Sequence, residues 1–258
     1  MAVFETIFVA FAMFSALPTP RVDWTEKNMR YALCAFPLVG LVVGAAWWGW
    51  AALSGLLGLG TVARAAGLCL LPVALTGGIH LDGYADTCDA LASHASPARK
   101  QEILKDPRCG AFAVLRLCVY FLAYFAVCTE FATSVKALSC TAILFVFSRT
   151  LSGLAIAALP LAKNTGLAHT FAATSDRRRV RGLLLALTAL LTALLVLVGG
   201  LSGAAAAAVG GLVFWRYAWV AKDQFGGISG DLAGWFLQRA ELWMLAALVV
   251  CQKVEALV

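Results

Sequence analysis

The stretch LLLALTALLTALLVLVGGL, residues 183–201, carries no charged side chain and is apolar on every face of a helix. About 20 such residues are enough for a helix to cross the roughly 30 Å hydrocarbon layer of a bilayer. Membrane-spanning β-strands would instead show segments of about ten residues that alternate apolar and polar side chains. Neither this stretch nor residues 137–148 shows that alternation, so the sequence predicts an all-α membrane protein.

The composition of the whole chain supports the same fold class. Its 258 residues are 62% hydrophobic and 13% charged, and the mean hydropathy is +0.85. Soluble domains average about 45–50% apolar and 25% charged residues. Water is therefore not the main solvent of this chain, and we expect a single integral membrane domain over residues 1–258.

Further apolar stretches predict the other membrane-spanning helices. The expected spans are seven: 31–50, 61–79, 117–135, 137–161, 183–201, 204–221 and 240–258. Residues 2–17 are also apolar, but Glu5 interrupts them and Pro18 and Pro20 follow. The sequence allows three interpretations of residues 2–17: an eighth span, a re-entrant segment or an interfacial helix. The expected fold is a polytopic bundle of about seven or eight transmembrane helices.

Charged segments between successive pairs of spans predict the topology. Those segments are 21–30, 99–108, 163–181 and 222–239, whereas the connections at 51–60 and 199–204 carry no charge. Because two spans lie between each charged segment and the next, all four lie on one side of the membrane. Their lysine and arginine content predicts that this side is cytoplasmic.

Net charge and cysteine content argue against two classes of function. The charge of +6 does not indicate nucleic-acid binding, because no basic stretch is interleaved with stacking aromatic residues. The eight cysteines form no CxxC pair and mostly sit inside apolar runs. We interpret them as small hydrophobic residues rather than disulfide or zinc ligands.

The most informative polar stretch is TGGIHLDGYADTCD, residues 76–89. In a helix, Asp82, Asp86 and Asp89 stand at i, i+4 and i+7 and share one face. Three like charges on one face repel one another unless a cation lies between them, and Mg²⁺ prefers carboxylate oxygens. We predict a metal site here, the alternative being a solvated helix face. His80 is either a structural residue or a base or ligand.

Two more polar stretches lie on the same predicted side. KDPRCG, from Lys105, brings Asp106 and Arg108 to the start of a span. Carboxylates mixed with cations suit a site that holds both a metal and a phosphate-bearing substrate. The alternative is a charge cluster at the membrane edge.

The other stretch, DQFGGISGD, begins at Asp223 and ends at Asp231. Both carboxylates are available to a metal. Gly226, Gly227 and Gly230 permit a tight loop whose backbone N–H groups could meet phosphate oxygens.

One arginine, Arg149, falls inside an apolar span. At a helix centre an arginine costs at least roughly 2.5–3.5 kcal/mol. We therefore expect a buried partner for it, either an anionic substrate or one of the aspartates.

Together these segments resemble the cobalamin synthase family, the adenosylcobinamide-GDP ribazoletransferases. The resemblance rests on FSALPTP (14–20), GGIHLDGYADTCDAL (77–91), EILKDPRCGAF (102–112), Ser148-Arg149 and DQFGGISGD (223–231). Pro107, Cys109 and Ser229 depart from the family pattern, but none of these departures removes a carboxylate.

The resemblance implies a Mg²⁺-dependent transferase of the last steps of cobalamin biosynthesis. It would move adenosylcobinamide phosphate from adenosylcobinamide-GDP to α-ribazole or α-ribazole 5′-phosphate and release GMP. The enzyme would span the bacterial cytoplasmic (inner) membrane, with its active site facing the cytoplasm. A complex with other late cobalamin-pathway enzymes is left open, and no nucleic acid is expected as a partner.

The resemblance also implies roles for the residues found above. The expected metal ligands are Asp82, Asp86 and Asp89, with Asp223 and Asp231 completing a second metal site or binding the nucleotide. The proton acceptor is His80 or Asp106. The pyrophosphate would be held by Lys105, Arg108 and Arg149, and the loop with Gly226, Gly227 and Gly230 would accommodate GDP or the ribazole ribose.

Two other classes share part of this pattern. A CDP-alcohol phosphotransferase also holds Mg²⁺ with aspartates at a membrane helix end, but its Asp-Gly-x-x-Ala-Arg arrangement leads to arginine where this chain has Asp86. A cation-coupled transporter tends to place carboxylates near the bilayer midplane, often in two repeated halves. Here the aspartates lie at predicted helix ends and no convincing repeat is present.

Overall fold

The structure, a computed structural model, describes residues 2–162 and 166–257, and this part of the chain is helical apart from turns, loops and one isolated β-bridge. The all-α prediction is confirmed. In chain order the helices are α1 (Ala2–Phe14), α2 (Glu26–Met29), α3 (Ala32–Leu56), α4 (Thr61–Thr76), α5 (Ile79–Ala92), α6 (Pro97–Ile103), α7 (Ala111–Glu130), α8 (Val135–Ala158), α9 (Leu167–Thr174), α10 (Arg177–Gly199), α11 (Leu201–Phe225) and α12 (Gly230–Glu255).

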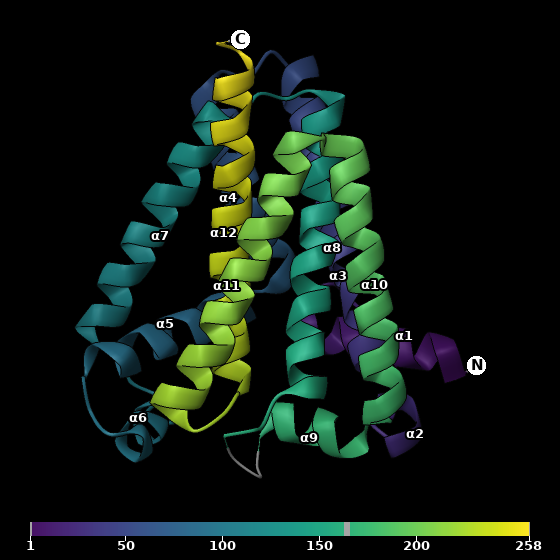
Figure 1. The fold of residues 1–258 in the computed structure, drawn as a ribbon, viewed down its shortest axis with the longest axis vertical. Helices are drawn as coiled ribbons and strands as arrows, with labels where there is room; N and C mark the ends of the chain where they lie inside the picture. The colour runs from purple at the N-terminus through teal and green to yellow at the C-terminus, as the bar shows by residue number, and fades with distance from the viewer. Residues whose placement is uncertain (1, 163–165, 258) are drawn as a thin grey trace.

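Among the described residues, six helices are long and apolar enough to cross a membrane, namely α3, α7, α8, α10, α11 and α12. Figure 1 shows α7, α8, α10, α11 and α12 running along the long axis of the molecule. The pair α4 and α5 adds a seventh span if the two are counted together. The predicted multi-pass membrane fold is confirmed.

The predicted span at 61–79 differs most from the structure. Helix α4 ends at Thr76, and Gly77 and Gly78 follow with φ angles of +65° and +78°. Glycine adopts this left-handed region readily because it has no Cβ atom. The chain bends by 95° there, so α5 crosses the bundle near one end instead of continuing along it (Figure 1). Helix α5 thus lies outside the six spans.

Two other spans begin earlier than predicted. The stretches at 117–135 and 240–258 belong to α7 and α12, which start at Ala111 and Gly230. Arg116 lies in the second turn of α7 and Asp231 in the first turn of α12, and such side chains depress hydropathy without breaking a helix. Hydropathy therefore placed the starts of α7 and α12, the helix ends nearest the polar loops, too late in the chain.

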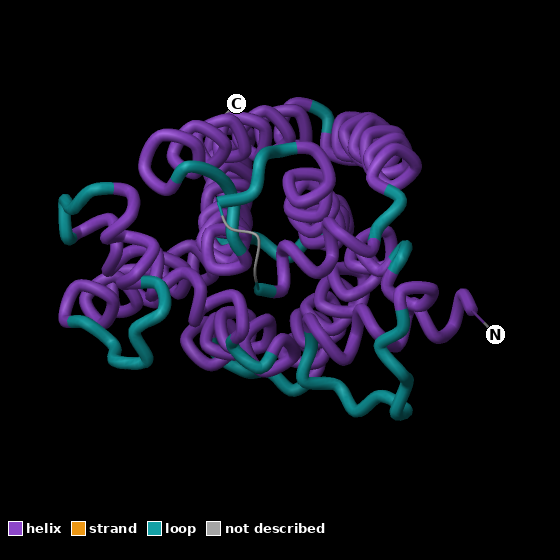
Figure 2. Tube along the Cα trace, turned by 90° about the horizontal axis from the view of Figure 1, so that it is seen from below, coloured by secondary structure: helices purple, strands orange, loops and turns teal. Residues whose placement is uncertain are grey.

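Helix α8 forms the centre of the bundle and packs against α3, α10 and α12. It is the most buried of the six candidate spans. Figure 2 shows the bundle from the end that carries α6 and α9, where several connecting loops gather. These loops include the polar stretches that the sequence singled out.

Helix α1 is too short to cross the bilayer on its own. It packs on α3, and the chain after it is tied to α4 because the Ala16 N–H donates to the Leu75 carbonyl at 2.8 Å. Of the alternatives for residues 2–17, the structure contains a short helix rather than a full span. This arrangement brings Phe14, the last residue of α1, to the start of α5.

Candidate active site

Helices α5 and α12 cross at very short range. A Cβ atom on Gly83 would lie only 2.7 Å from the Asp231 carbonyl oxygen, so a larger residue at this position would push the helices apart. Helix α12 is capped by Ser229, whose hydroxyl accepts a hydrogen bond from the Leu232 N–H at 3.3 Å. The first turn of α12, with Asp231, therefore lies beside α5.

Asp86 is the centre of a group of carboxylates. Burial and the charges of Asp82, Asp231 and Asp89 raise the pKa of Asp86 to about 6. The aspartates of the sequence motif do lie on one helix, α5, as predicted, and Asp231 joins them from α12. Among the described residues, Asp82, Asp86 and Asp89 form no ion pair with a basic side chain. The protein leaves this negative charge largely uncompensated.

The chemistry of this group fits a hard divalent cation. In the part of the chain that the structure describes, no three His, Cys, Asp or Glu side chains stand close enough to hold an ion by themselves. Mg²⁺ commonly binds through one or two carboxylates and completes its octahedron with water and substrate phosphate oxygens. The residues therefore fit a metal shared with a phosphate-bearing substrate better than a metal held by protein ligands alone.

The loop between α6 and α7 reaches the same carboxylates. A Cβ atom on Gly110 would lie 2.2 Å from Oδ1 of Asp89, so α7 begins directly against that side chain. Within the loop, Arg108 donates to both oxygens of Asp106, from Nε to Oδ1 at 2.8 Å and from Nη2 to Oδ2 at 2.7 Å. These hydrogen bonds lower the pKa of Asp106 to about 2. Lys105 is exposed on the same loop.

Helix α6 holds the second predicted loop, residues 223–231, in place. Lys100, which is buried, donates to the side-chain oxygen of Gln224. Gln101 donates from Nε2 to the Phe225 carbonyl at 2.6 Å. The charged segments 99–108 and 222–239, which the sequence placed on one side of the membrane, are thus in direct contact.

The glycines of this loop do not act as expected. The Gly226 N–H donates to the Lys222 carbonyl at 3.2 Å, and the Gly227 N–H donates to the Ala221 carbonyl at 2.9 Å. Both donors cap the end of α11, which corrects the prediction that they face phosphate. Gly230, in contrast, starts α12 and lines a pocket next to Asp231.

Asp223 stands apart from the carboxylate group. It is exposed near the end of α11 and accepts a hydrogen bond from Gln224 Nε2 at 2.5 Å. It is not among the charges that shift the pKa of Asp86. Of the two aspartates predicted in this loop, the structure brings only Asp231 to the group on α5.

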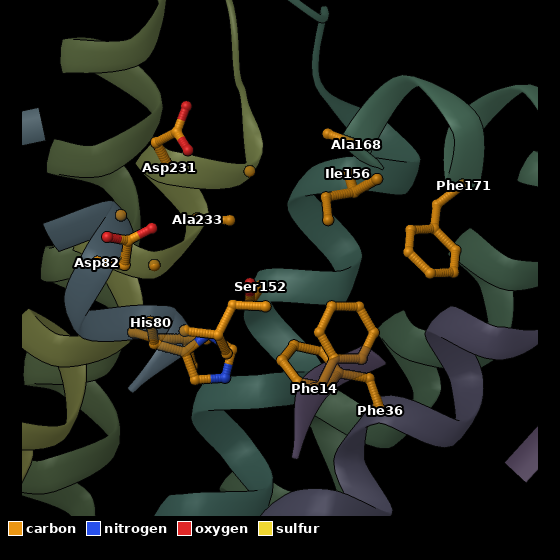
Figure 3. Close-up of a pocket in the computed structure, with 15 residues that line it drawn as sticks. Phe14, Phe36, His80, Asp82, Ser152, Ile156, Ala168, Phe171, Asp231 and Ala233 are labelled. Carbon is orange, nitrogen blue, oxygen red and sulfur yellow. The ribbon is translucent and has the colours of Figure 1, made fainter. Parts of the chain in front are cut away.

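A pocket of about 280 Å³ opens beside Asp82 and Asp231. Figure 3 shows the two carboxylates on one side of the pocket and three phenylalanines, Phe14, Phe36 and Phe171, on the other. His80 lines the pocket between them, is 5% exposed, and has no hydrogen-bond partner for Nε2 in the structure.

Arg149 has a different partner from either predicted one. Its guanidinium donates to Glu241 of α12, and both side chains are 1% exposed. Ser148 also donates to Glu241, at 3.2 Å. This corrects the expectation that Arg149 holds pyrophosphate, because a protein carboxylate already compensates its charge in the core. The signal for Glu241 was present in the sequence as a carboxylate inside the predicted span 240–258.

Comparison with known proteins gives a consistent result. A family model described as CobS, cobalamin-5-phosphate synthase, matches residues 6–249. A protein of Lachnoclostridium phytofermentans named adenosylcobinamide-GDP ribazoletransferase is 41% identical over 257 residues, which cover 97% of this chain and 95% of the relative. Proteins of the same name from Stutzerimonas stutzeri and Geobacillus thermodenitrificans are 35% and 34% identical, cover 91% of this chain, and are themselves covered to 91% and 92%. No solved structure matches the chain significantly.

Proposed function

The chain belongs to the CobS, or cobalamin-5-phosphate synthase, family, and from this premise we propose that it is a Mg²⁺-dependent membrane transferase with its active site between α5 and α12. The reaction is the one that names its relatives, adenosylcobinamide-GDP ribazole transfer. Adenosylcobinamide phosphate passes from its GDP conjugate to α-ribazole or α-ribazole 5′-phosphate, and GMP leaves.

One observation carries the location of the site. Carboxylates from two helices gather around Asp86 without a basic partner for those of α5, at the mouth of a pocket. A structural role would favour compensated charges, since like charges in close proximity disfavour their ionised forms. A cation that arrives with the substrate supplies the missing compensation.

The reaction needs in-line positioning of the two substrates, neutralisation of the phosphoryl charge and a proton acceptor. A ribose hydroxyl attacks the phosphorus next to the cobinamide, and the bond to the GMP oxygen breaks in line with it. Mg²⁺, when bound, neutralises charge on the phosphoryl oxygens. In our proposal Asp82 and Asp231, at the pocket mouth, hold the metal, with Asp86 and Asp89 adding negative charge behind them.

His80 is the better candidate for the proton acceptor. It lines the pocket beside Asp82, and its Nε2 has no partner within the protein. Asp106 does not line the pocket, and Arg108 donates to both of its oxygens. The pKa is low for both groups, about 3 for His80 through burial and the Arg149 charge and about 2 for Asp106 through its Arg108 hydrogen bonds, so the geometry and not the pKa favours His80. We assign to Lys105, exposed on the loop that touches Asp89, the role of attracting the pyrophosphate.

We place the active site on the cytoplasmic side of the bacterial inner membrane. Contacts between the charged segments support their predicted location on one side. Lys100 bonds to Gln224, and Arg30 pairs with Asp176 at 3.4 Å. Lysine and arginine in such segments favour the cytoplasmic side. A complex with other enzymes of the pathway stays a prediction.

The test is a turnover assay with purified protein in lipid. GMP release from adenosylcobinamide-GDP and α-ribazole 5′-phosphate is measured with and without Mg²⁺ for the wild type, Asp82→Asn and Glu130→Gln. Glu130 is an exposed carboxylate at the other end of α7, paired with Lys253. We expect Mg²⁺-dependent turnover that Asp82→Asn abolishes and Glu130→Gln retains. A folded wild type without turnover would reject the proposed reaction and make CDP-linked substrates the next to try.

A further inference from the structure

The pocket beside the carboxylates is close in size to a small-ligand site. Its volume of about 280 Å³ is just below the roughly 300–1,000 Å³ typical of ligand pockets. Its lining comes from α1, α3, α5, α8, α9 and α12. The carboxylates and His80, to which the proposed function assigns roles, occupy only one side of it (Figure 3).

The opposite side is an aromatic wall. The ring centroids of Phe14 and Phe36 lie 4.2 Å apart, and those of Phe14 and Phe171 lie 5.5 Å apart. Ile156 and Leu237 add aliphatic surface to the same pocket. A wall of this kind favours a flat apolar ring, which can stack or pack edge-on against phenylalanine.

One polar atom interrupts this apolar surface. Ser152 of α8 lines the pocket, is 1% exposed, and its Oγ has no hydrogen-bond partner in the structure. Figure 3 places it between His80 and the phenylalanines. A buried hydroxyl without a partner is costly, so a ligand atom that accepts its hydrogen bond would remove that cost.

We propose that this pocket binds the base of the ribazole nucleoside, with the ring against Phe14, Phe36 and Phe171 and with the Ser152 hydroxyl donating to its free ring nitrogen. This inference rests on the proposed function and names the subsite of the acceptor. The base is a dimethylated benzimidazole, which is flat, bicyclic and apolar. Once one ring nitrogen carries the ribose, the other is its single hydrogen-bond acceptor.

The other groups of the two substrates fit this pocket less well. A corrin ring system is far larger than a cavity of 280 Å³. Guanine presents several donors and acceptors on its edges, and on the side of the pocket opposite the carboxylates and His80 the polar lining side chain is that of Ser152. Burying the remaining groups without partners would cost binding energy.

The position of the pocket also suits the reaction. With the base against the phenylalanines, the attached ribose extends toward His80 and Asp82, the residues on the opposite side (Figure 3). A ribose hydroxyl then lies between the proposed proton acceptor and the proposed metal ligands. Ser152 and the phenylalanines act as binding residues for the acceptor and take no part in bond making.

Steady-state kinetics with each substrate varied separately test the assignment. Ser152→Ala removes one hydrogen bond and should raise the KM for α-ribazole about threefold to tenfold. Phe171→Leu keeps an apolar side chain but loses the ring, and should raise the same KM by about twofold to tenfold. The KM for adenosylcobinamide-GDP should not change in either variant.

A matched control lies on the same helix. Thr150 is buried, does not line the pocket, and donates its hydroxyl to the Val146 carbonyl at 2.8 Å. Thr150→Val removes a buried hydroxyl of α8 without touching the pocket, so both KM values should stay at wild-type levels. A rise of the α-ribazole KM in this variant equal to that in Ser152→Ala would overturn the inference.

Equilibrium dialysis of labelled α-ribazole, without the corrinoid substrate, separates the two proposals. We expect binding to the wild type, weaker binding to Ser152→Ala and Phe171→Leu by the same factors, and competition by free dimethylbenzimidazole but not by guanosine. Unchanged binding in both variants, or competition by guanosine alone, would reject the subsite even if turnover is normal. A wild type that binds α-ribazole but does not turn over would reject the proposed reaction while the pocket assignment stands.

Discussion

In the core of the bundle, the charge of Arg149 on α8 is compensated by Glu241 on α12, and Ser148 adds a hydrogen bond to the same carboxylate. At the end of the same helix α12, Asp231 lies instead beside the carboxylates of α5, and the charges around Asp86 are of its own sign. Helix α12 thus contributes one carboxylate to a compensated ion pair and another to a group of like charges.

The difference separates a structural from a functional use of charge. A buried ion pair is complete without any ligand, and removal of one partner leaves an uncompensated charge in the interior. The carboxylate group between α5 and α12 is incomplete as it stands, because like charges raise the free energy of the ionised form. The first arrangement stabilises the fold, and the second creates a requirement for a cation.

The largest expected effect comes from breaking the core pair. Glu241→Leu leaves the Arg149 guanidinium buried without its carboxylate and should lower the free energy of unfolding by about 3–5 kcal/mol. Unfolding of the purified protein in mixed micelles by a denaturing detergent measures this change. The double variant Arg149→Met with Glu241→Leu should recover most of the loss, and equal loss in both variants would contradict a structural pair.

A substitution in the carboxylate group should reduce activity without reducing stability, in contrast to Glu241→Leu. Asp82→Asn should lower kcat/KM by at least about 100-fold, since even residues that only support a metal ligand cost 10–100-fold. It should not lower the free energy of unfolding measured without Mg²⁺, because it removes repulsion. Destabilisation of the size expected for Glu241→Leu would show that this group, too, is structural.

Mg²⁺ itself should stabilise the protein through the same group. At a free concentration ten times its dissociation constant, a ligand that binds only the folded state adds about 1.4 kcal/mol. Thermal unfolding in the presence of adenosylcobinamide-GDP, with and without Mg²⁺, measures the shift. Glu130→Gln should show the same shift as the wild type and Asp231→Asn should not, and a shift that survives in Asp231→Asn would place the ion elsewhere.

The smallest effect is expected at the exposed pair of Arg108 and Asp106. Its side chains are 87% and 34% exposed, and solvent screening makes such pairs weak contributors to stability. Arg108→Ala should leave the unfolding temperature unchanged. A clear loss of stability would mean that the loop, like the core pair, has a structural function.

Local sequence pattern was enough to predict the part of the site on α5. Asp82, Asp86 and Asp89 are spaced for one helical face, and that helix exists. The break before it was less accessible, because hydropathy joined residues 61–79 into one span across Gly77 and Gly78. Glycine in the left-handed region ends α4 there, and hydropathy contains no information on backbone angles.

Tertiary packing determined the remainder of the site. Asp231 reaches the group on α5 because Gly83 lets the two helices approach, and neither residue indicates this contact in the sequence. The aromatic wall comes from Phe14, Phe36 and Phe171, on three helices that are distant along the chain. Single phenylalanines in apolar helices give no sign of a pocket.

The most direct test of the contrast between the two regions is metal binding itself. Mn²⁺, as a paramagnetic substitute for Mg²⁺, is titrated into the purified protein with adenosylcobinamide-GDP present, and the free ion is followed by electron paramagnetic resonance. We predict that the wild type and Glu130→Gln bind Mn²⁺ and that Asp82→Asn combined with Asp231→Asn abolishes this binding in a protein that remains folded. Unchanged Mn²⁺ affinity in the double variant would contradict the assignment of the metal to the carboxylates between α5 and α12.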